Sequence, residues 1–468
     1  MADPNYPSSE GPTSAGSTPS ETPGAAGTPP EDGVNPGTHH LLPRAPAISW
    51  WMLLITTLAI LMTSVDHQIL PAVLPQVSEQ YNLTPDQAGL INSVYFAGLV
   101  VGGIAFGYIS DRIGTGYRRT WTWNIAMLFA VIGGALTFGL AGSFIAFLLL
   151  RIPMGISRGG SEPVNVAIVS EWWPKEHRGF AVGVHHTGFP IGQFLAGALI
   201  AIVLGSAHWS AAFLVIPLLG IPIIIGQTIL GRKRHQATLY RKIEEMKQTP
   251  PLEELSAKST GGIWGPVKEA LRHANVRWAV LLCFLFLYGE AGVVTFLTLH
   301  FRELGMDVAD AILVSGASGL TGWIGQVVWG TLSDRLGRKF SIAFLIGGYV
   351  LSMLAMLLIV DLTTAWLVLL FWGLFRNAPF PVVYALLVDS VPRAAGTAMG
   401  IMIGVALGVS GIVASAVSGV VITQLGFTWH YVVLAGICLI GFIPLARITE
   451  TVQVARRGRG GPDAPVPA

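Results

Sequence analysis

Twelve apolar runs recur along the chain, each close to the roughly 20 residues that cross a bilayer as a helix, and they constrain the fold more than any other feature. Only helices and closed β-barrels satisfy their backbone hydrogen bonds inside hydrocarbon. Runs this long and uniformly apolar lack the alternation of barrel strands. The sequence therefore predicts an all-α membrane protein with twelve transmembrane helices. The runs lie at about 48–70, 87–110, 119–139, 143–170, 180–204, 209–230, 277–299, 308–330, 339–360, 364–388, 396–422 and 429–447.

The composition excludes an ordinary soluble domain. Hydrophobic residues make up 52% of the chain and charged residues only 12%, against about 25% charged residues in soluble domains. No basic cluster is interleaved with aromatic residues as in a nucleic-acid groove, so we expect no nucleic-acid partner. The two cysteines, Cys283 and Cys438, lie in apolar runs without disulfide or metal-ligand spacing. We therefore expect no metal ion and no cofactor.

The ends and the loops indicate how the chain lies in the membrane. Residues 1–47 are rich in Pro, Gly, Ser and Thr and lack the basic and apolar segments of a signal peptide, which predicts a disordered tail. If this end is inside, Arg302 is the only Lys or Arg in the loops on the other side. The positive-inside rule then places both termini in the cytoplasm. We expect a multi-pass monomer in the lipid bilayer of the cell (plasma or inner) membrane.

Internal repeats show that the chain is a duplicated unit. The segment GYISDRIG at 107–114 recurs as GTLSDRLG at 330–337, an offset of 330 − 107 = 223 residues. A second set of matches, at an offset of 218, relates Gly155, Arg158, Pro163, Glu171 and Pro174 to Gly373, Arg376, Pro381, Asp389 and Pro392. Such parallel repeats occur in transporters built from two halves. The predicted division is a tail (1–47), a six-helix bundle (48–230), a cytoplasmic linker (231–276), a second six-helix bundle (277–447) and a cytoplasmic tail (448–468).

The two repeated turns resemble a signature of the major facilitator superfamily. Between helices 2 and 3 that family carries Gly-x-x-x-Asp-Arg-x-Gly followed by basic residues, and both halves of this chain match it. The resemblance covers about 48–447. It implies two pseudo-symmetric six-helix bundles that work as a secondary transporter by alternating access.

The stretch that begins at Arg151 resembles the anion:cation symporter branch of the same superfamily. The matching residues are Arg151, Gly155, Pro163, Trp172, Pro174, Arg178 and Gly179. The chain departs from the branch at His67, where arginine is usual, and at Arg158, where an acidic residue is common. This resemblance implies a small organic anion as substrate.

Charged residues near the middle of the predicted helices are candidates for function, because each costs about 2.5–3.5 kcal/mol to insert. The repeat relates Arg158 to Arg376, so we expect both to face one central cavity. A guanidinium can bind a carboxylate through two parallel hydrogen bonds. We predict that Arg376 binds the anionic group, with Arg158 facing it from the other bundle. The predicted substrate contacts are Arg376, Arg158, Arg151, Asn377 and His67.

Alternatives stay open for each arginine. Glu162 lies four residues after Arg158 and could neutralise it. Arg376 could balance Asp66 or Glu290 across the bundle. Arg151 lies nearer the end of its helix and could extend to the interface.

Carboxylates in the same region are candidates for proton coupling. A carboxylate in a partly dehydrated cavity holds a proton more readily, and a nearby guanidinium opposes this. We predict that Asp66 carries the proton, with Glu162 and then Glu290 as further candidates. The alternative for Asp66 is a permanent salt bridge.

The repeated turns also predict two ion-pair clusters that gate the transporter. We expect these clusters to hold the bundles together while the site is open outward. In one cluster Asp111 and Arg112 face Glu171 and Arg178; in the other Asp334 and Arg335 face Asp389 and Arg393.

These observations predict a proton-coupled symporter of a small organic anion. A proton-driven exporter of drug-like molecules and a non-transporting receptor or scaffold are the alternatives. The sequence contains no phosphate loop, no metal-spaced histidines and no nucleophile elbow. We therefore do not expect an enzyme.

Overall fold

The computed structural model describes residues 43–452 apart from 114–115, 175–176, 249, 251–263, 392–397 and 399–400. Within these residues the chain is helical and contains no strand. The described residues from Arg44 onward belong to one compact unit. Most of the two predicted tails, 1–42 and 453–468, lies outside the described residues.

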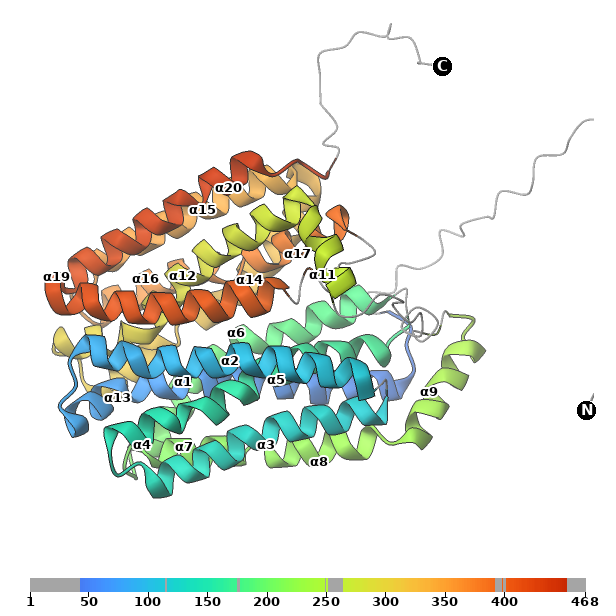
Figure 1. The fold of residues 1–468 in the computed structure, drawn as a ribbon, viewed down its shortest axis with the longest axis horizontal. Helices are drawn as coiled ribbons and strands as arrows, with labels where there is room; N and C mark the ends of the chain where they lie inside the picture. Colours follow the sequence, from blue (N-terminus) through green and yellow to red (C-terminus); the bar gives the residue numbers. More distant parts are fainter. Residues whose placement is uncertain are drawn as a thin grey trace, which may run out of the picture. The chain divides into compact units, whose positions relative to one another are not determined.

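Long helices run side by side, and the short helices α9 and α11 both lie at the same end of them (Figure 1). The first half contains α1 (Ala47–Tyr81), α2 (Pro85–Ile113), α3 (Tyr117–Leu140), α4 (Phe144–Leu149), α5 (Arg151–Glu171), α6 (Arg178–Leu204), α7 (Ala211–Leu218) and α8 (Ile221–Leu230). The connecting segment contains α9 (Lys233–Glu245) and α11 (Trp264–Arg272). The second half contains α12 (Ala274–Glu303), α13 (Val308–Ser315), α14 (Ser318–Leu336), α15 (Arg338–Ala355), the 3₁₀ turn η2 (Met356–Leu358), α16 (Leu362–Arg376), α17 (Pro379–Ser390), the π-helix η4 (Met402–Val409), α19 (Ser410–Ile440) and α20 (Phe442–Arg447).

Ten stretches of the described chain are long and apolar enough to cross a membrane, and two local features account for the difference from twelve. The run predicted at 143–170 forms α4 and α5, whose Arg151, Arg158, Glu162 and Glu171 make it more polar than a typical span. This segment still packs along α2 and α3, which are both candidate spans. The last stretch, Met402–Arg447, joins two predicted spans.

A turn at Gly426 divides that last stretch. Its φ of 79° lies in the left-handed region, which glycine adopts without the steric cost of a β-carbon. The predicted runs 396–422 and 429–447 therefore correspond to separate passes on either side of Gly426. With α4 and α5 counted as one pass, the fold has the twelve transmembrane helices of the prediction.

The tenth predicted span breaks where the sequence places two prolines. Helix α16 begins with a capping box at Asp361 and ends at Arg376, and α17 begins at Pro379. Proline lacks the backbone N–H that would continue the helix, whereas it suits the first turn of a new one. The break leaves Arg376 at the end of a helix rather than inside one.

We call the end of the molecule that contains Asn82, Gly305 and Gly426 the far end, and the end with the repeated turns the motif end. The two halves pack closely at the far end. There α2 packs on α19, and α6 packs on α13 and α14. A β-carbon at Gly89 would overlap the carbonyl oxygen of Ser415, and one at Gly319 would overlap that of Pro190. Small residues thus allow the backbones of the two halves to approach.

A buried polar cluster joins the halves beside these glycines. The Asn92 side-chain amide donates to the Thr295 hydroxyl at 2.5 Å and to the Ser415 hydroxyl at 3.1 Å. The Ser93 hydroxyl donates to the backbone oxygen of Ile412 at 2.9 Å. We call Gly89, Asn92, Thr295 and Ser415 the latch. Its hydrogen bonds and its backbone contact close the far end of the molecule.

Candidate functional site

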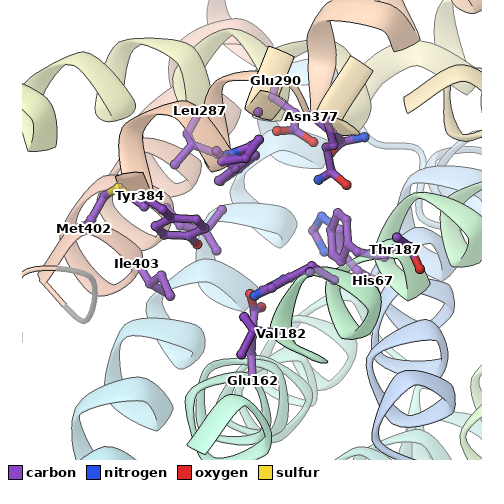
Figure 2. A pocket seen from close by; sticks show the side chains of 18 of the residues that line it. His67, Glu162, Val182, Thr187, Leu287, Glu290, Asn377, Tyr384, Met402 and Ile403 are labelled. Carbon is purple, nitrogen blue, oxygen red and sulfur yellow. The ribbon is translucent and has the colours of Figure 1, made fainter. Parts of the chain in front are cut away.

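A cavity of about 730 Å³ lies between the halves and is lined by residues from both. Most of its lining is hydrophobic, with a few charged and polar side chains. Figure 2 shows Glu290 and Asn377 on one side of the cavity, Glu162 and Val182 on the other, and His67 and Tyr384 facing each other between them. Ligand sites commonly combine such an apolar lining with a few polar groups that fix orientation.

Arg158 and Glu162 supply the charges of the first half. Both residues lie on α5, one turn apart, and an Arg158 Nη2 to Glu162 Oε2 distance of 3.1 Å makes them an ion pair. The guanidinium packs over the Phe189 ring, 4.8 Å from its centroid. Arg158 is only 6% exposed, and its Nη1 has no hydrogen-bond partner among the described residues. The cavity wall thus carries a buried cationic donor that lacks an acceptor.

The related arginine of the second half is bound by side chains of its own half. Arg376 Nε donates to Glu290 Oε1 at 2.8 Å, and Nη1 donates to the Ser318 hydroxyl at 2.8 Å. Its guanidinium also lies over the Trp372 ring. Glu290 lines the large cavity, whereas Arg376 lines a separate void of about 10 Å³. The structure thus places Glu290 between Arg376 and the large cavity.

Asp66 and His67 lie on α1, near Arg158 of α5. One carboxylate oxygen of Asp66 is buried without a hydrogen-bond partner among the described residues, and Arg158 lies within electrostatic range of it. His67 lines the cavity and stacks on Tyr95, with ring centroids 5.6 Å apart. Asn377 lines the cavity from the other half, and its amide donates to Gln193 at 3.3 Å. Three of the five predicted substrate contacts, Arg158, His67 and Asn377, therefore line the cavity.

Arg151 lies apart from this group. Its guanidinium is sandwiched between the rings of Phe147 and Phe213, at 4.4 and 4.2 Å from their centroids. It also donates to the Thr137 hydroxyl. The residue is 1% exposed and is not among the residues found to line the cavity. These contacts hold Arg151 inside the first half, neither in the cavity nor extended toward the interface.

The repeated turns build the same polar cluster in each half. Arg119 forms an ion pair with the buried Glu171 and donates to Ser110 at 2.9 Å. Arg338 pairs with Asp389 at 3.4 Å and donates to Ser333 at 2.5 Å. Both arginines were missed as gate residues. Three extra residues, Thr115 to Tyr117, precede the first basic pair, so that Arg119 and Arg338 are not aligned by the motif.

Glu171 and Asp389 each pair with an arginine of their own half, Arg119 and Arg338 respectively. Arg335 is exposed in the last turn of α14. The side chains of Asp111, Arg112, Arg178 and Asp334, and all of Arg393, lie outside what the structure describes. The predicted role of the two clusters in holding the halves together therefore stays a prediction.

In each half, the segment after the sixth span covers the repeated turn. A β-carbon at Gly116 would overlap the Gln236 side chain of α9, whose amide donates to the Tyr240 hydroxyl at 2.9 Å. Burial raises the pKa of Tyr240 to about 12. In the second half, the backbone N–H groups of Arg338 and Lys339 donate to Glu450 at 3.0 and 2.9 Å. The N-terminus of α15 is thus capped by a carboxylate from beyond α20.

Burial and hydrogen bonding act in opposite directions on Glu450. Burial disfavours the charged carboxylate, but hydrogen bonds from backbone N–H groups, including those of Lys339 and Val452, hold its pKa below the usual range. Hydrogen bonds to the charged form outweigh desolvation here.

Aromatic side chains of the cavity were not foreseen. Phe189, Phe380 and Tyr384 line it, but in sequence they are indistinguishable from aromatic residues that face lipid or fill a helix interface. Ser318, the partner of Arg376, also carries no sequence signal. No group of three or more His, Cys, Asp or Glu suited to a metal ion occurs in the described part of the chain.

Comparisons with known proteins agree with this architecture. The family model for the Major Facilitator Superfamily matches residues 53–406. The cis,cis-muconate transport protein of Acinetobacter baylyi is 25% identical over 353 residues, covering 74% of this chain and 81% of that protein. The benzoate transport protein of the same organism is 25% identical over 326 residues, covering 65% and 69%.

Solved structures show the same fold. The xylose transporter XylE from E. coli, in a partially occluded inward open conformation, superposes with a TM-score of 0.68 at 17% identity, covering 87% of this chain and 99% of that one. Both the family match and the relatives are transporters rather than enzymes. The chain is therefore a multi-pass membrane transporter of small organic metabolites, and it belongs to the Major Facilitator Superfamily.

Proposed function

We propose that this transporter is a proton-coupled symporter of a small organic anion, and that Arg158 binds the anionic group. The observation that carries the proposal is that Arg158 lines the cavity while its buried Nη1 has no hydrogen-bond partner among the described residues. A buried donor without an acceptor costs about 1–3 kcal/mol, and more when charged. A carboxylate oxygen of the substrate would supply the missing acceptor as a charge-assisted hydrogen bond.

Coupling to protons follows from the acids around this arginine. Glu162 already pairs with Arg158, so an arriving anion competes with it for the guanidinium. Asp66 has a buried oxygen without a described partner, and such a group is stabilised by taking up a proton. Protonation of Asp66, or else of Glu162 or Glu290, removes negative charge and favours the anion. Proton and anion would therefore bind together.

The latch and the cavity fit one stage of alternating access. The far end is closed by contacts between the halves, while the cavity lining extends toward the motif end at Phe180, Thr331 and Met402. If Lys and Arg place the motif end in the cytoplasm, this is a state open or opening inward. The outward-open state then requires the latch to separate as the bundles 48–230 and 277–447 rock against each other.

The relatives support an organic acid as the substrate class. Their names specify muconate and benzoate transport, and both compounds are carboxylates. The arginine in the cavity suits such a group better than it suits the cationic or neutral substrates of many exporters.

Uptake into liposomes tests the proposal. The purified protein would be reconstituted, and accumulation of a panel of labelled carboxylates measured with an acid-outside pH gradient, with no gradient, and with a membrane potential alone. We expect at least one acid to accumulate only when the pH gradient is present. Accumulation that ignores the gradient would refute proton coupling, and transport restricted to cationic drug-like compounds would favour an exporter.

A further inference from the structure

We infer that the substrate is an aromatic monocarboxylate whose ring packs against Tyr384, with its carboxylate on Arg158. The inference rests on the proposed function and names the substrate class of the same site. It comes from three features of the cavity: its aromatic lining, the scarcity of its hydrogen-bonding groups and the placement of its acids.

Aromatic rings line the cavity from both halves. The first half contributes His67, Phe96, Phe180, His186 and Phe189, and the second contributes Phe380 and Tyr384. The rings of His186 and Tyr384 face each other across the halves, with centroids 6.2 Å apart, and Phe380 lies 6.2 Å from Tyr384. Aromatic pairs are favourable at 4.5–7 Å in offset or edge-to-face arrangements. A planar ring in this cavity can therefore make several such contacts at once.

The carboxylate anchor lies beside these rings. Arg158 lines the cavity with one face of its guanidinium stacked on Phe189, and the edge of the guanidinium carries the buried Nη1, which has no hydrogen-bond partner among the described residues. Because Phe189 also lines the cavity, a carboxylate on that edge places the adjoining body of the substrate against an aromatic wall. A carboxyl group attached directly to a ring has this shape.

Few groups in the cavity can form the hydrogen bonds that the hydroxyl groups of a substrate would lose on leaving water. Beyond the charged residues and the histidines, the polar lining residues are Thr187, Gln326, Thr331, Asn377 and Tyr384. Of the Asn377 amide, the nitrogen already donates to Gln193, which leaves only the oxygen without a described partner. A sugar acid carries several hydroxyl groups, and each one buried without a partner costs free energy. The lining therefore disfavours polyhydroxylated acids.

The acids of the cavity disfavour a second carboxylate. Glu162 and Glu290 line it on opposite sides (Figure 2). When one carboxylate occupies Arg158, a second one on the same ligand meets Glu162 or Glu290, because Arg376 lies outside the large cavity behind Glu290. Two carboxylates within one cavity repel each other strongly when the surrounding medium has a low dielectric constant. A single negative charge is thus the best match.

Equilibrium binding to the purified protein tests the inference, with benzoate, cyclohexanecarboxylate, gluconate and terephthalate as probes. We expect benzoate to bind best, and gluconate and terephthalate at least about tenfold more weakly. Tyr384→Leu should weaken benzoate binding about tenfold and gluconate binding less than twofold, since it removes one ring contact and its buried area. Tyr384→Phe keeps the ring and should stay within about threefold of wild type.

The control variant is Phe340→Leu, which removes an aromatic ring that is 56% exposed and does not belong to the cavity lining. It should leave all four affinities unchanged. Tighter binding of gluconate or terephthalate than of benzoate, or an unchanged benzoate affinity in Tyr384→Leu, would overturn the inference. If binding of those acids still requires Arg158 and their uptake still requires the pH gradient, the inference fails but the proposed function stands. If no probe binds and no carboxylate accumulates, both fail together.

Discussion

At the scale of single residues, two arginines related by the repeat have different surroundings. Arg158 lies inside α5, lines the cavity and has a buried Nη1 without a described partner, whereas Arg376 ends α16 and is bound by Glu290 and Ser318. The sequence predicted that both would bind the substrate, with Arg376 as the stronger candidate. Arg376 stands next to the break before Pro379, whereas Arg158 lies within the continuous helix α5.

Replacement of Arg158 by Lys tests the assignment of the anion site. Lysine keeps the charge but loses the planar pair of donors, so affinity for the bound acid should fall about tenfold or more, equivalent to about 1.4 kcal/mol. Arg241→Lys is a matched control, since Arg241 also pairs with a glutamate four residues on but is 70% exposed. Binding by purified variants of confirmed fold decides the matter. A larger loss in Arg376→Lys than in Arg158→Lys would return the anion site to Arg376.

Replacement of Asp66 by Asn tests the proton carrier. Asparagine resembles the protonated acid and cannot release a proton, so accumulation driven by a pH gradient should be lost while exchange of substrate across the membrane persists. Uptake and counterflow in liposomes measure the two activities separately. If gradient-driven accumulation survives both in Asp66→Asn and in Glu162→Gln, the proton site lies elsewhere and Glu290 is the next candidate.

At the scale of helices, the sequence predicted where the chain crosses the membrane but not how the helices break and meet. The spans could be predicted because burial in lipid requires every one of them to have an apolar composition. The breaks at Asn377 and Gly426 depend on one or two residues. The latch depends on Asn92 meeting Thr295 and Ser415 from distant parts of the chain. Contacts of that kind have no local signature in a single sequence.

Replacement of Gly89 by Ala tests the latch. The added methyl group would overlap the Ser415 carbonyl oxygen, and relieving it costs about 1–3 kcal/mol as in other overpacked sites. The balance should shift about fivefold or more toward states in which the far ends separate. Distances between spin labels at Glu79→Cys and Gln424→Cys would report the change as a longer component.

Gly347→Ala is the control for the latch. Nothing lies within 4 Å of a β-carbon built at Gly347, which is also within a helix of the bundle. Its distance distribution should match that of the parent protein. An unchanged distribution in Gly89→Ala would show that the latch does not hold the far end closed.

At the scale of the whole molecule, the repeat predicted two equivalent halves. The polar clusters at the motif end are built from the same kinds of residue in both halves. Ser110, Arg119 and Glu171 in one half correspond to Ser333, Arg338 and Asp389 in the other. The halves differ in what lies over the cluster, which is α9 in the first half and Glu450 in the second. Motif spacing could not reveal these covering segments, because they lie beyond the repeated residues.

Replacement of Glu450 by Gln should destabilise the second half modestly, by about 1 kcal/mol as for other helix caps, and should lower Tm by about 1–3 °C. Because hydrogen bonds from backbone N–H groups hold the carboxyl pKa below its usual range, the stabilisation is present above that range and is lost as pH falls through the lowered pKa. Thermal unfolding in detergent at several pH values measures this. A Tm difference that persists unchanged in acid would contradict it, and the exposed Glu245→Gln provides the control.

The segments that cover the two repeated turns also bear on the ancestry of the fold. Each half ends by folding the residues after its sixth span back over its own second-to-third helix turn, through Gln236 in one case and Glu450 in the other. A six-helix ancestor that fastened its own tail in this way would have been complete before duplication. Joining two copies then required only a connector between finished units, and no new means of securing either one.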